Sequence, residues 1–418
     1  MLGWRMSLNR LHIRRIFIAA TAILLGCVPA LVAEMDTKIE FHTSGGFTGN
    51  LLFDSNSVND AYSAASANIK FYPYSNLEVS LENEYTYYGK IFGLSNFNGG
   101  VGLTFIPTDN DSRLSLYFNG RFNSRLYRMD YSGFNSDIFE ISTAVGYLIA
   151  PAFQMRSGFM FKSERYPGGH THEEDEEEEQ FPTFDISPDN EVYEFFLGGN
   201  LALFGHVALD IEGGYERLNL TYVNPPTDSM FAFWEDPPSR ILRNYLNPNK
   251  DSLIDGTLDA YYISPRISFH IKDKIGVNVI YIYRAFSDPD NIIIPGLSIK
   301  FLSPWASVYE DDAIAINLKT YLVPGMIVTA GAGYWDKDFL TSEQERPASD
   351  GLAGPTTIIN DRKDETSKFY LGVQKPFTFR SGLFLEPTLY MEYISNRSSY
   401  DFYDYSAFSA AFGLIFRL

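Results

Sequence analysis

Charged side chains that alternate with apolar ones are the residues of this sequence best suited to act on a solute. Between residues 113 and 126, arginine stands at odd positions (Arg113, Arg121 and Arg125), whereas leucine and phenylalanine stand at even ones. Acids alternate in the same way near residues 77–87 and 207–216, where they are Glu78, Glu82, Glu84, Asp210 and Glu212. Charges gathered on one face of a wall would create a field that favours polar solutes over apolar ones.

A second candidate is the acidic run at residues 167–179, which contains His170 and His172. Imidazole and carboxylate groups are ordinary ligands of divalent metals. Long runs of like charge are usually solvated loops. We therefore predict no specific metal site, and we keep His170 and His172 as weak candidates; loose binding of divalent ions near anionic surface lipid is the alternative.

Catalytic motifs are missing from the sequence. It has no Gly-x-Ser-x-Gly elbow and no His-Glu-x-x-His pair. His42 and His270 stand at polar positions of predicted strands, where a lone histidine is usually a wall residue. We expect no enzyme activity and no cofactor.

The elements that hold these charges are predicted to be strands, because side chains alternate between the two faces of a strand. Residues 383–393 are a further example, with Leu383, Leu385 and Leu389 against Glu386 and Glu392. After the N-terminal 33 residues, no stretch is long and apolar enough for a membrane helix. The fold class is therefore all-β.

Aromatic residues favour a transmembrane barrel over a soluble sandwich. The chain contains 28 Tyr and 34 Phe, and they cluster near both ends of the apolar faces. Aromatic girdles of this kind mark the two membrane–water boundaries. The predicted girdles are Tyr85, Tyr87, Tyr281, Tyr283 and Tyr393 before long loops, and Phe71, Phe105, Phe153, Phe269 and Phe416 beside short turns. Since backbone groups in lipid must pair within the protein, the sheet must close.

Seven short turns alternate with eight longer loops, which predicts a single closed antiparallel barrel of about sixteen strands at 34–418, with fourteen or eighteen as alternatives. Both termini then lie on the short-turn side. The long external loops are 166–188, 224–255, 288–311 and 340–365, and their acids include Asp311 and Asp312. The apolar loop 288–311 either folds into the lumen and narrows it, or extends a strand above the membrane.

Residues 1–33 read as a cleaved secretory signal peptide, because four arginines precede an apolar stretch that ends in small residues. The pattern before Cys27 is similar to a lipoprotein site, so lipidation there is an alternative. Cys27 is the only cysteine of the chain, and no disulfide framework is expected.

The last strand carries Phe408, Phe412 and Phe416 on one face and ends at Leu418. It resembles the terminal strand by which bacterial outer-membrane β-barrels are recognised for assembly, and we assign this signal to Phe412, Phe416 and Leu418. The chain also resembles porin-like barrels in general. The resemblance implies location in the outer membrane, and as partners its lipid, the barrel assembly machinery, periplasmic chaperones and a possible homotrimer.

Two kinds of irregularity stand out. Pro265 and Pro387 fall on the lipid-facing side of predicted strands, where each requires a bulge or a local break, with a hinge or lateral opening as the functional alternative. Glycine pairs at 45–46, 99–100, 198–199 and 213–214 are predicted to permit tight curvature.

The inner face would carry charges of both signs, which cannot sit in a dry core without a large cost. We therefore predict a hydrated lumen and a porin-like channel for passive diffusion of small hydrophilic solutes. The alternative is a structural or surface-interaction barrel with a blocked lumen. Within the lumen, the charges form either a transverse field or salt bridges that stiffen the wall. The net charge of −19 argues against nucleic acid as a partner.

Overall fold

The structure is a computed structural model that describes residues 36–50, 58–108, 112–128, 135–166, 189–221, 255–272, 274–287, 309–321, 325–339, 363–379, 382–399 and 404–417. Within these residues, no helix is long and apolar enough to cross a membrane. The predicted signal peptide 1–33 with Cys27, the candidates His170 and His172, and Leu418 all lie outside the described residues.

The described chain is almost entirely strand, with one turn of 3-10 helix, η1 (Phe92–Leu94). The strands are β1 (Asp36–Thr48), β2 (Asp60–Tyr74), β3 (Leu77–Tyr88), β4 (Asn96–Phe105), β5 (Leu114–Tyr127), β6 (Ser136–Ala150), β7 (Phe153–Arg165), β8 (Asp189–Phe204), β9 (Val207–Thr221), β10 (Asp255–Ile271), β11 (Ile275–Phe286), β12 (Tyr309–Thr320), β13 (Ile327–Phe339), β14 (Lys363–Gln374), β15 (Phe377–Thr378), β16 (Phe384–Ser398) and β17 (Tyr405–Arg417).

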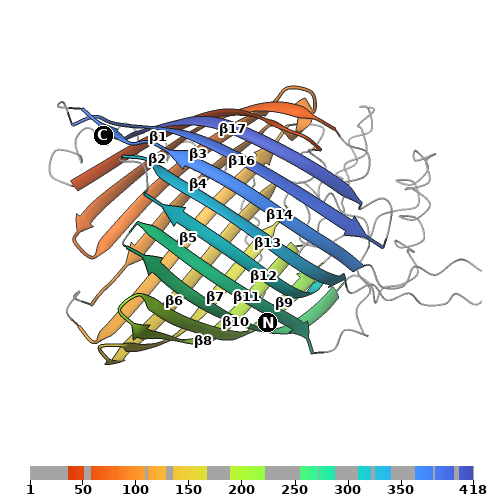
Figure 1. Ribbon diagram of the computed structural model, residues 1–418. Helices are drawn as coiled ribbons and strands as arrows, with labels where there is room; N and C mark the ends of the chain where they lie inside the picture. Colours follow the sequence, from red (N-terminus) through yellow and green to blue (C-terminus); the bar gives the residue numbers. More distant parts are fainter. Residues whose placement is uncertain are drawn as a thin grey trace, which may run out of the picture.

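All strands belong to one 17-stranded antiparallel sheet that closes on itself (Figure 1). The seam joins β1 to β17, from the pair Glu40 and Arg417 to the pair Thr48 and Ser409. β15 has two residues and pairs with the beginning of β16, where it continues the line of β14. The remaining sixteen strands form the barrel, and the predicted fold class and strand number are confirmed.

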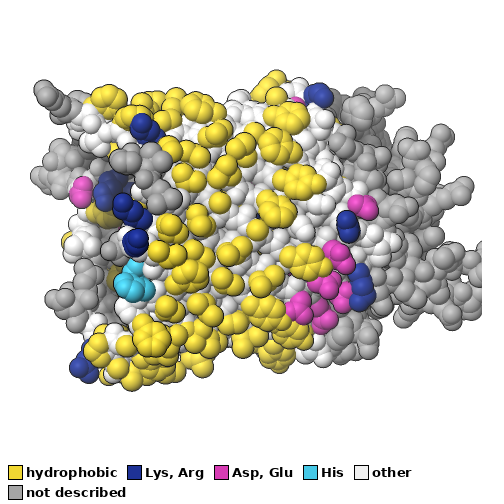
Figure 2. Space-filling view, in the orientation of Figure 1, with side chains coloured by type: hydrophobic (Ala, Val, Ile, Leu, Met, Phe, Trp, Pro, Cys, Tyr) yellow, Lys and Arg dark blue, Asp and Glu magenta, His cyan; other side chains and the backbone are white. Residues whose placement is uncertain are grey.

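The period of two seen in the sequence separates the two faces of the wall. On β8, Phe195 and Leu197 are 52% and 57% exposed, and they point away from the barrel interior. Phe196, which lies between them, faces the interior. Figure 2 shows the result on one face of the barrel, a broad apolar band with charged side chains towards its two rims. Such a band is the lipid-facing surface of a transmembrane barrel.

The aromatic girdle predicted on the loop side is confirmed. The side chains of Tyr85, Tyr87, Tyr281, Tyr283 and Tyr393 are between 40% and 46% exposed, and all lie on the outward register. On the turn side, Phe105, Phe153, Phe269 and Phe416 also lie on the outward register. Phe71 also lies on the outward register, opposite Val79, but it is buried beside an irregularity in the β2–β3 pairing.

The connections follow the predicted alternation. The first residue of β1 and the last residue of β17 both lie at the end where turns are short, as the pairings of Asp36 with Tyr72 and of Arg417 with Phe384 show. The long loops fall mostly outside the described residues, but three strands begin inside the predicted loop ranges. Asp311 and Asp312 therefore belong to β12 and were wrongly assigned to a loop.

The two prolines interrupt the ladder without shifting its register. Pro265 pairs with Ile211 on β9, while pairing with β11 pauses at positions 264–265 and resumes in the same register. Pro387 lies beside the interruption between β14 and β15, which also keeps the register. The bulge predicted at each proline is thus wrong, and the local break is correct, because a proline lacks only the N–H that the ladder would use. The register shifts found in the described strands lie beside short turns, at Phe71/Tyr74, Leu148/Ala150 and Ala202/Phe204.

Short turns at one end, longer connections at the other, a closed even-numbered barrel and an outward apolar band are the features of a bacterial outer-membrane β-barrel. On the face that Figure 2 shows, the charged side chains of the described residues lie near the two rims. At the loop-side rim, Asp312 on β12 lies opposite Asp336 on β13, and Asp336 lies opposite Glu365 on β14. The hydroxyl of Tyr281 donates a hydrogen bond to Asp312.

Candidate functional site

The inner face of the barrel holds nearly all of the charged residues selected from the sequence. Strand pairing places all but one of them on the inward register: Glu78, Glu82 and Glu84 on β3, Arg121 and Arg125 on β5, and Asp210 and Glu212 on β9. Arg113 is the exception. It precedes β5 and lies exposed in the turn, where its carbonyl accepts a hydrogen bond from the N–H of Leu148. Arg113 thus directly precedes β5 and continues its register, and the role predicted for it in the lumen remains a prediction.

Arg121 is bound to an acid two strands away. Its guanidinium forms an ion pair with Glu82 on β3, and β4 lies between them. The residue of β4 opposite Arg121 is Gly102, and the one opposite Glu82 is Gly100. Because neither glycine has a side chain, the arginine can cross β4 to reach the carboxylate.

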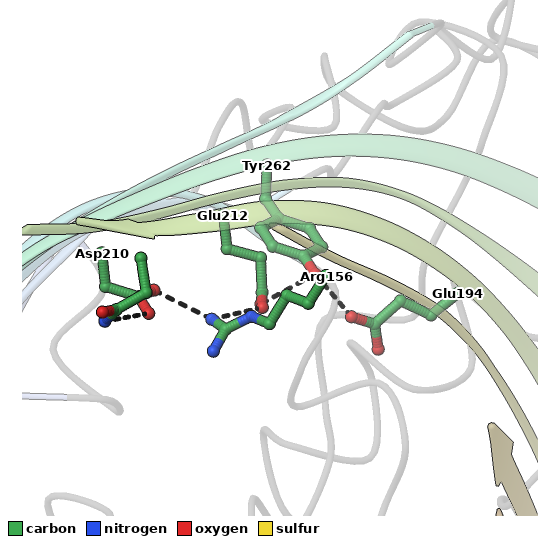
Figure 3. Close-up of polar contacts among 6 residues, drawn as sticks. Arg156, Glu194, Asp210, Glu212 and Tyr262 are labelled. Atoms are coloured by element: carbon green, nitrogen blue, oxygen red, sulfur yellow. Dashed lines mark hydrogen bonds and ion pairs between the residues drawn. The ribbon is translucent and has the colours of Figure 1, made fainter. Parts of the chain in front are cut away.

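The acids of β9 are bound in the same way by an arginine of β7. Arg156 lies 2.8 Å from Asp210 and 2.8 Å from Glu212, so one guanidinium holds both carboxylates. Between them lies Gly198 of β8, which pairs with Arg156 on one side and Glu212 on the other. A Cβ on Gly198 would stand 3.1 Å from Nε of Arg156. Figure 3 shows Arg156 extended between the two acids.

Tyr262 is a third side chain that reaches across a neighbouring strand on the inner face. The hydroxyl of Tyr262 on β10 donates a hydrogen bond of 2.6 Å to Glu194 on β8, and it lies 3.4 Å from Glu212 (Figure 3). The ring lies over Gly214 of β9, where an added Cβ would overlap it. The Tyr262 hydroxyl thus lies between two carboxylates and donates its proton to the nearer one, Glu194.

Arg284 on β11 completes the group by pairing with Glu216 on β9 at 3.0 Å. It crosses β10 near Ala260, which is buried. We call this group the lumen cluster, and its members are Arg156, Glu194, Asp210, Glu212, Glu216, Tyr262 and Arg284. It occupies the inner face of five consecutive strands, β7 to β11.

The glycine pairs therefore do more than permit curvature, which was the predicted role. One member of each pair faces inward beneath a larger side chain from the next strand: Gly46 beneath Tyr62, Gly100 beneath Asn123, Gly198 beneath Arg156 and Gly214 beneath Tyr262. Gly331 repeats the arrangement, because the Tyr370 ring crosses it and the Tyr370 hydroxyl donates to Asn317 at 2.9 Å. These glycines let polar side chains lie flat on the wall and bridge alternate strands.

The electrostatics differ from a simple transverse field. β3 and β9 are rich in acids, as predicted, but basic residues on nearby strands bind most of them, and Lys70 pairs with Glu78 at 2.8 Å. Elsewhere on the inner face, Lys368 pairs with Glu392 at 2.7 Å. Arg417 pairs with Glu40 across the seam. Of the two arrangements expected from the sequence, the geometry matches salt bridges within the wall.

Five members of the lumen cluster are not among the determinants selected from the sequence: Arg156, Glu194, Glu216, Tyr262 and Arg284. The roles of Arg156 and Tyr262 depend on which strands are neighbours. A sequence signal existed, since both residues stand opposite glycine pairs, but reading it requires the strand register.

His42 and His270 lie on the inward face, as predicted, and His270 contacts a second histidine. Nδ1 of His206, in the turn after β8, lies 2.9 Å from Nε2 of His270 on β10. Nε2 of His42 on β1 lies close to Gly413 on β17. Among the described residues, no three or more metal-binding side chains gather in one place.

At the loop end of the barrel, inward polar groups are buried. Asp60 is 1% exposed, and its carboxylate accepts hydrogen bonds of 2.8–3.1 Å from the N–H groups of Gly89, Lys90 and Ile91. The connection between β3 and β4 is thereby fixed to the end of β2. Asp364 and Asn396, also inward, are fully buried and bound to each other.

Comparisons with known proteins assign this chain to no family. The chain matches no protein-family model and no curated protein. Among solved structures, it is similar to a loop L8 deletion mutant of OmpT, an outer membrane protein of Vibrio cholerae, with 14% identity, 92% of this chain and 99% of that chain covered, and a TM-score of 0.40. OccAB1 of Acinetobacter baumannii has 9% identity, with 92% and 97% covered and a TM-score of 0.44. OccK2 of Pseudomonas aeruginosa, solved in complex with glucuronate, has 10% identity, with 92% and 98% covered and a TM-score of 0.38.

Proposed function

We propose that this barrel is a channel for passive diffusion of small hydrophilic solutes across the outer membrane. The observation that carries the proposal is the exposure of ionised groups inside a closed wall. The side chain of Arg156 is 39% exposed, and those of Arg121 and Glu82 are 43% and 35% exposed, although all three face inward. Charged groups in a packed interior would lie buried at a large desolvation cost. Their exposure supports a lumen filled with water.

The size of the barrel supports the same conclusion. Small barrels fill their interior with side chains, whereas barrels of about sixteen strands leave room for an aqueous channel. Solutes would move down their own gradients, so the activity needs no cofactor. The ion-paired wall would keep the lumen polar and would exclude apolar solutes.

One observation favours the alternative, a barrel whose lumen is blocked or narrowed at the loop end. There, inward residues such as Asp60, Asp364 and Asn396 are buried, in contrast to the exposed charges of Arg156 and Arg121. A narrow mouth would limit the size of the solute. In a barrel with a blocked lumen, the outward acids of the same rim would carry a role at the cell surface.

The test is a measurement on refolded protein in lipid. Purified barrels are inserted into planar bilayers to record single-channel currents, and into liposomes to record swelling in sugars of increasing size. Discrete current steps, with swelling in small sugars but not in large ones, are expected. Barrels that are folded by circular dichroism yet give neither current nor swelling would overturn the channel proposal in favour of a blocked lumen.

A further inference from the structure

Glu194 occupies a distinctive position in the lumen cluster. It lies on the inward face of β8 and accepts the 2.6 Å hydrogen bond from the Tyr262 hydroxyl. A tyrosine hydroxyl is neutral, so this bond orients the carboxylate without cancelling its charge. Figure 3 shows Glu194 and Arg156 on opposite sides of the Tyr262 hydroxyl.

The two arginines of the cluster are engaged elsewhere. Arg156 binds Asp210 and Glu212, both at 2.8 Å, and Arg284 binds Glu216 at 3.0 Å. In the described part of the chain, no lysine, arginine or histidine forms an ion pair with Glu194. Arg266 on the inner face of β10 lies opposite Asp210. Four carboxylates thus face three guanidinium groups, and the charge left over is negative.

The rest of the cluster keeps this charge in place. Tyr262 lies flat over Gly214, where a Cβ would overlap its ring, so it has little freedom to turn away from Glu194. The hydroxyl also lies 3.4 Å from Glu212, which brings a second carboxylate to the same point. A fixed negative charge on the wall of a water-filled pore attracts cations and repels anions, and low-dielectric walls strengthen the effect.

We infer that Glu194 is a specificity-determining residue that makes the channel prefer cations over anions, so that small hydrophilic solutes bearing ammonium or guanidinium groups pass more readily than carboxylates of similar size. The inference rests on the proposed channel function and names its solute class. The chain's net charge of −19 has the same sign and would reinforce the preference.

The experiment measures reversal potentials in planar bilayers under a gradient of KCl, at a pH about three units above the usual carboxylate pKa of ~4. The unmodified barrel should show a K⁺/Cl⁻ permeability ratio above one. Glu194→Gln should lower the ratio by about two- to five-fold, the effect expected of one unit charge close to the ion path. Tyr262→Phe should leave the sign of the preference unchanged, because it keeps the carboxylate.

Glu191→Gln is the matched control. Glu191 lies on the same strand and also accepts a tyrosine hydroxyl, that of Tyr193 at 2.9 Å, but it faces outward. It should leave the permeability ratio unchanged. All variants are first checked for a folded barrel by circular dichroism and by heat-dependent mobility in gels.

The outcomes separate the two proposals. Currents of normal size with an unchanged permeability ratio in Glu194→Gln would overturn the role of Glu194 and leave the channel function intact. An equal change in Glu191→Gln would also overturn it, because the effect would then be one of surface charge. Folded barrels without any current would overturn the channel function, and the solute preference with it.

Discussion

Arg156 on β7 and Glu212 on β9 form a 2.8 Å ion pair across an entire intervening strand. The pair is possible because Gly198 of β8 leaves the surface between them open. Each such bridge joins strands that share no backbone hydrogen bonds. These ion pairs therefore hold together alternate strands, which the backbone hydrogen bonds of the sheet do not connect directly.

Arg156→Gln should lower the stability of the barrel. The change leaves Asp210, whose side chain is only 12% exposed, and Glu212 without a counter-ion. Leaving partly buried charged groups without a partner should cost about 1–3 kcal/mol of unfolding free energy. Urea unfolding in lipid vesicles, followed by tryptophan fluorescence, measures the change.

The control for this prediction is Arg217→Gln. Arg217 pairs with Asp259 at 2.7 Å on the outward face, with a side chain that is 47% exposed. Exposed ion pairs contribute little, so its loss should matter less. Equal destabilisation by the two substitutions would show that the ion pairs across Gly198 stabilise the barrel no more than an exposed ion pair does.

Gly214→Ala should displace Tyr262 and break its bond to Glu194, because the new Cβ would overlap the tyrosine ring. Overpacking of this kind should cost about 1–3 kcal/mol. The comparison is Gly120→Ala on β5, where nothing lies within 4 Å of the added Cβ. If both variants unfold at the same urea concentration, the crossing of Tyr262 over Gly214 is not a tight contact.

Asp60→Asn should loosen the connection between β3 and β4. The change removes the negative charge from the acceptor of the N–H groups of Gly89, Lys90 and Ile91. Hydrogen bonds to charged groups contribute about 1.5–3 kcal/mol, so residues 89–95 should become accessible to proteases added outside cells. Asp137→Asn, on the outward face of β6, is the control. Unchanged resistance to proteolysis in Asp60→Asn would show that the carboxylate is not what holds the connection.

Phe412→Ala and Phe416→Ala should reduce assembly in cells more than refolding in detergent. The reason is that both lie on the outward face of the last strand, and Phe412 is 55% exposed. Phe195→Ala on β8 removes an outward phenylalanine of similar exposure, 52%, away from the terminal strand. The folded fraction of each variant, measured in membranes and after refolding, distinguishes a recognition signal from lost stability. Similar losses for Phe195→Ala would contradict an assembly signal at the C-terminus.

The sequence was sufficient to predict the fold class, the number of long strands and the face on which most charged residues lie. Glu82 and Arg121 could be placed on the inner wall from sequence because the alternation of side chains is a local property of an extended backbone. Strand ends were less certain. Arg113 keeps the odd-numbered spacing, but it directly precedes the first residue of β5.

Only the tertiary structure decided which charges meet. Arg156 could be seen to face inward, but its acids lie 54 and 56 residues away along the chain, and they become neighbours only when β8 is paired on both sides. Whether a side chain can cross a strand also depends on the residue that the register places beneath it, as Gly214 beneath Tyr262 shows. The physical reason is that orientation is fixed by local backbone geometry, whereas ion pairing depends on distance, and distance between strands is set by the closed sheet as a whole.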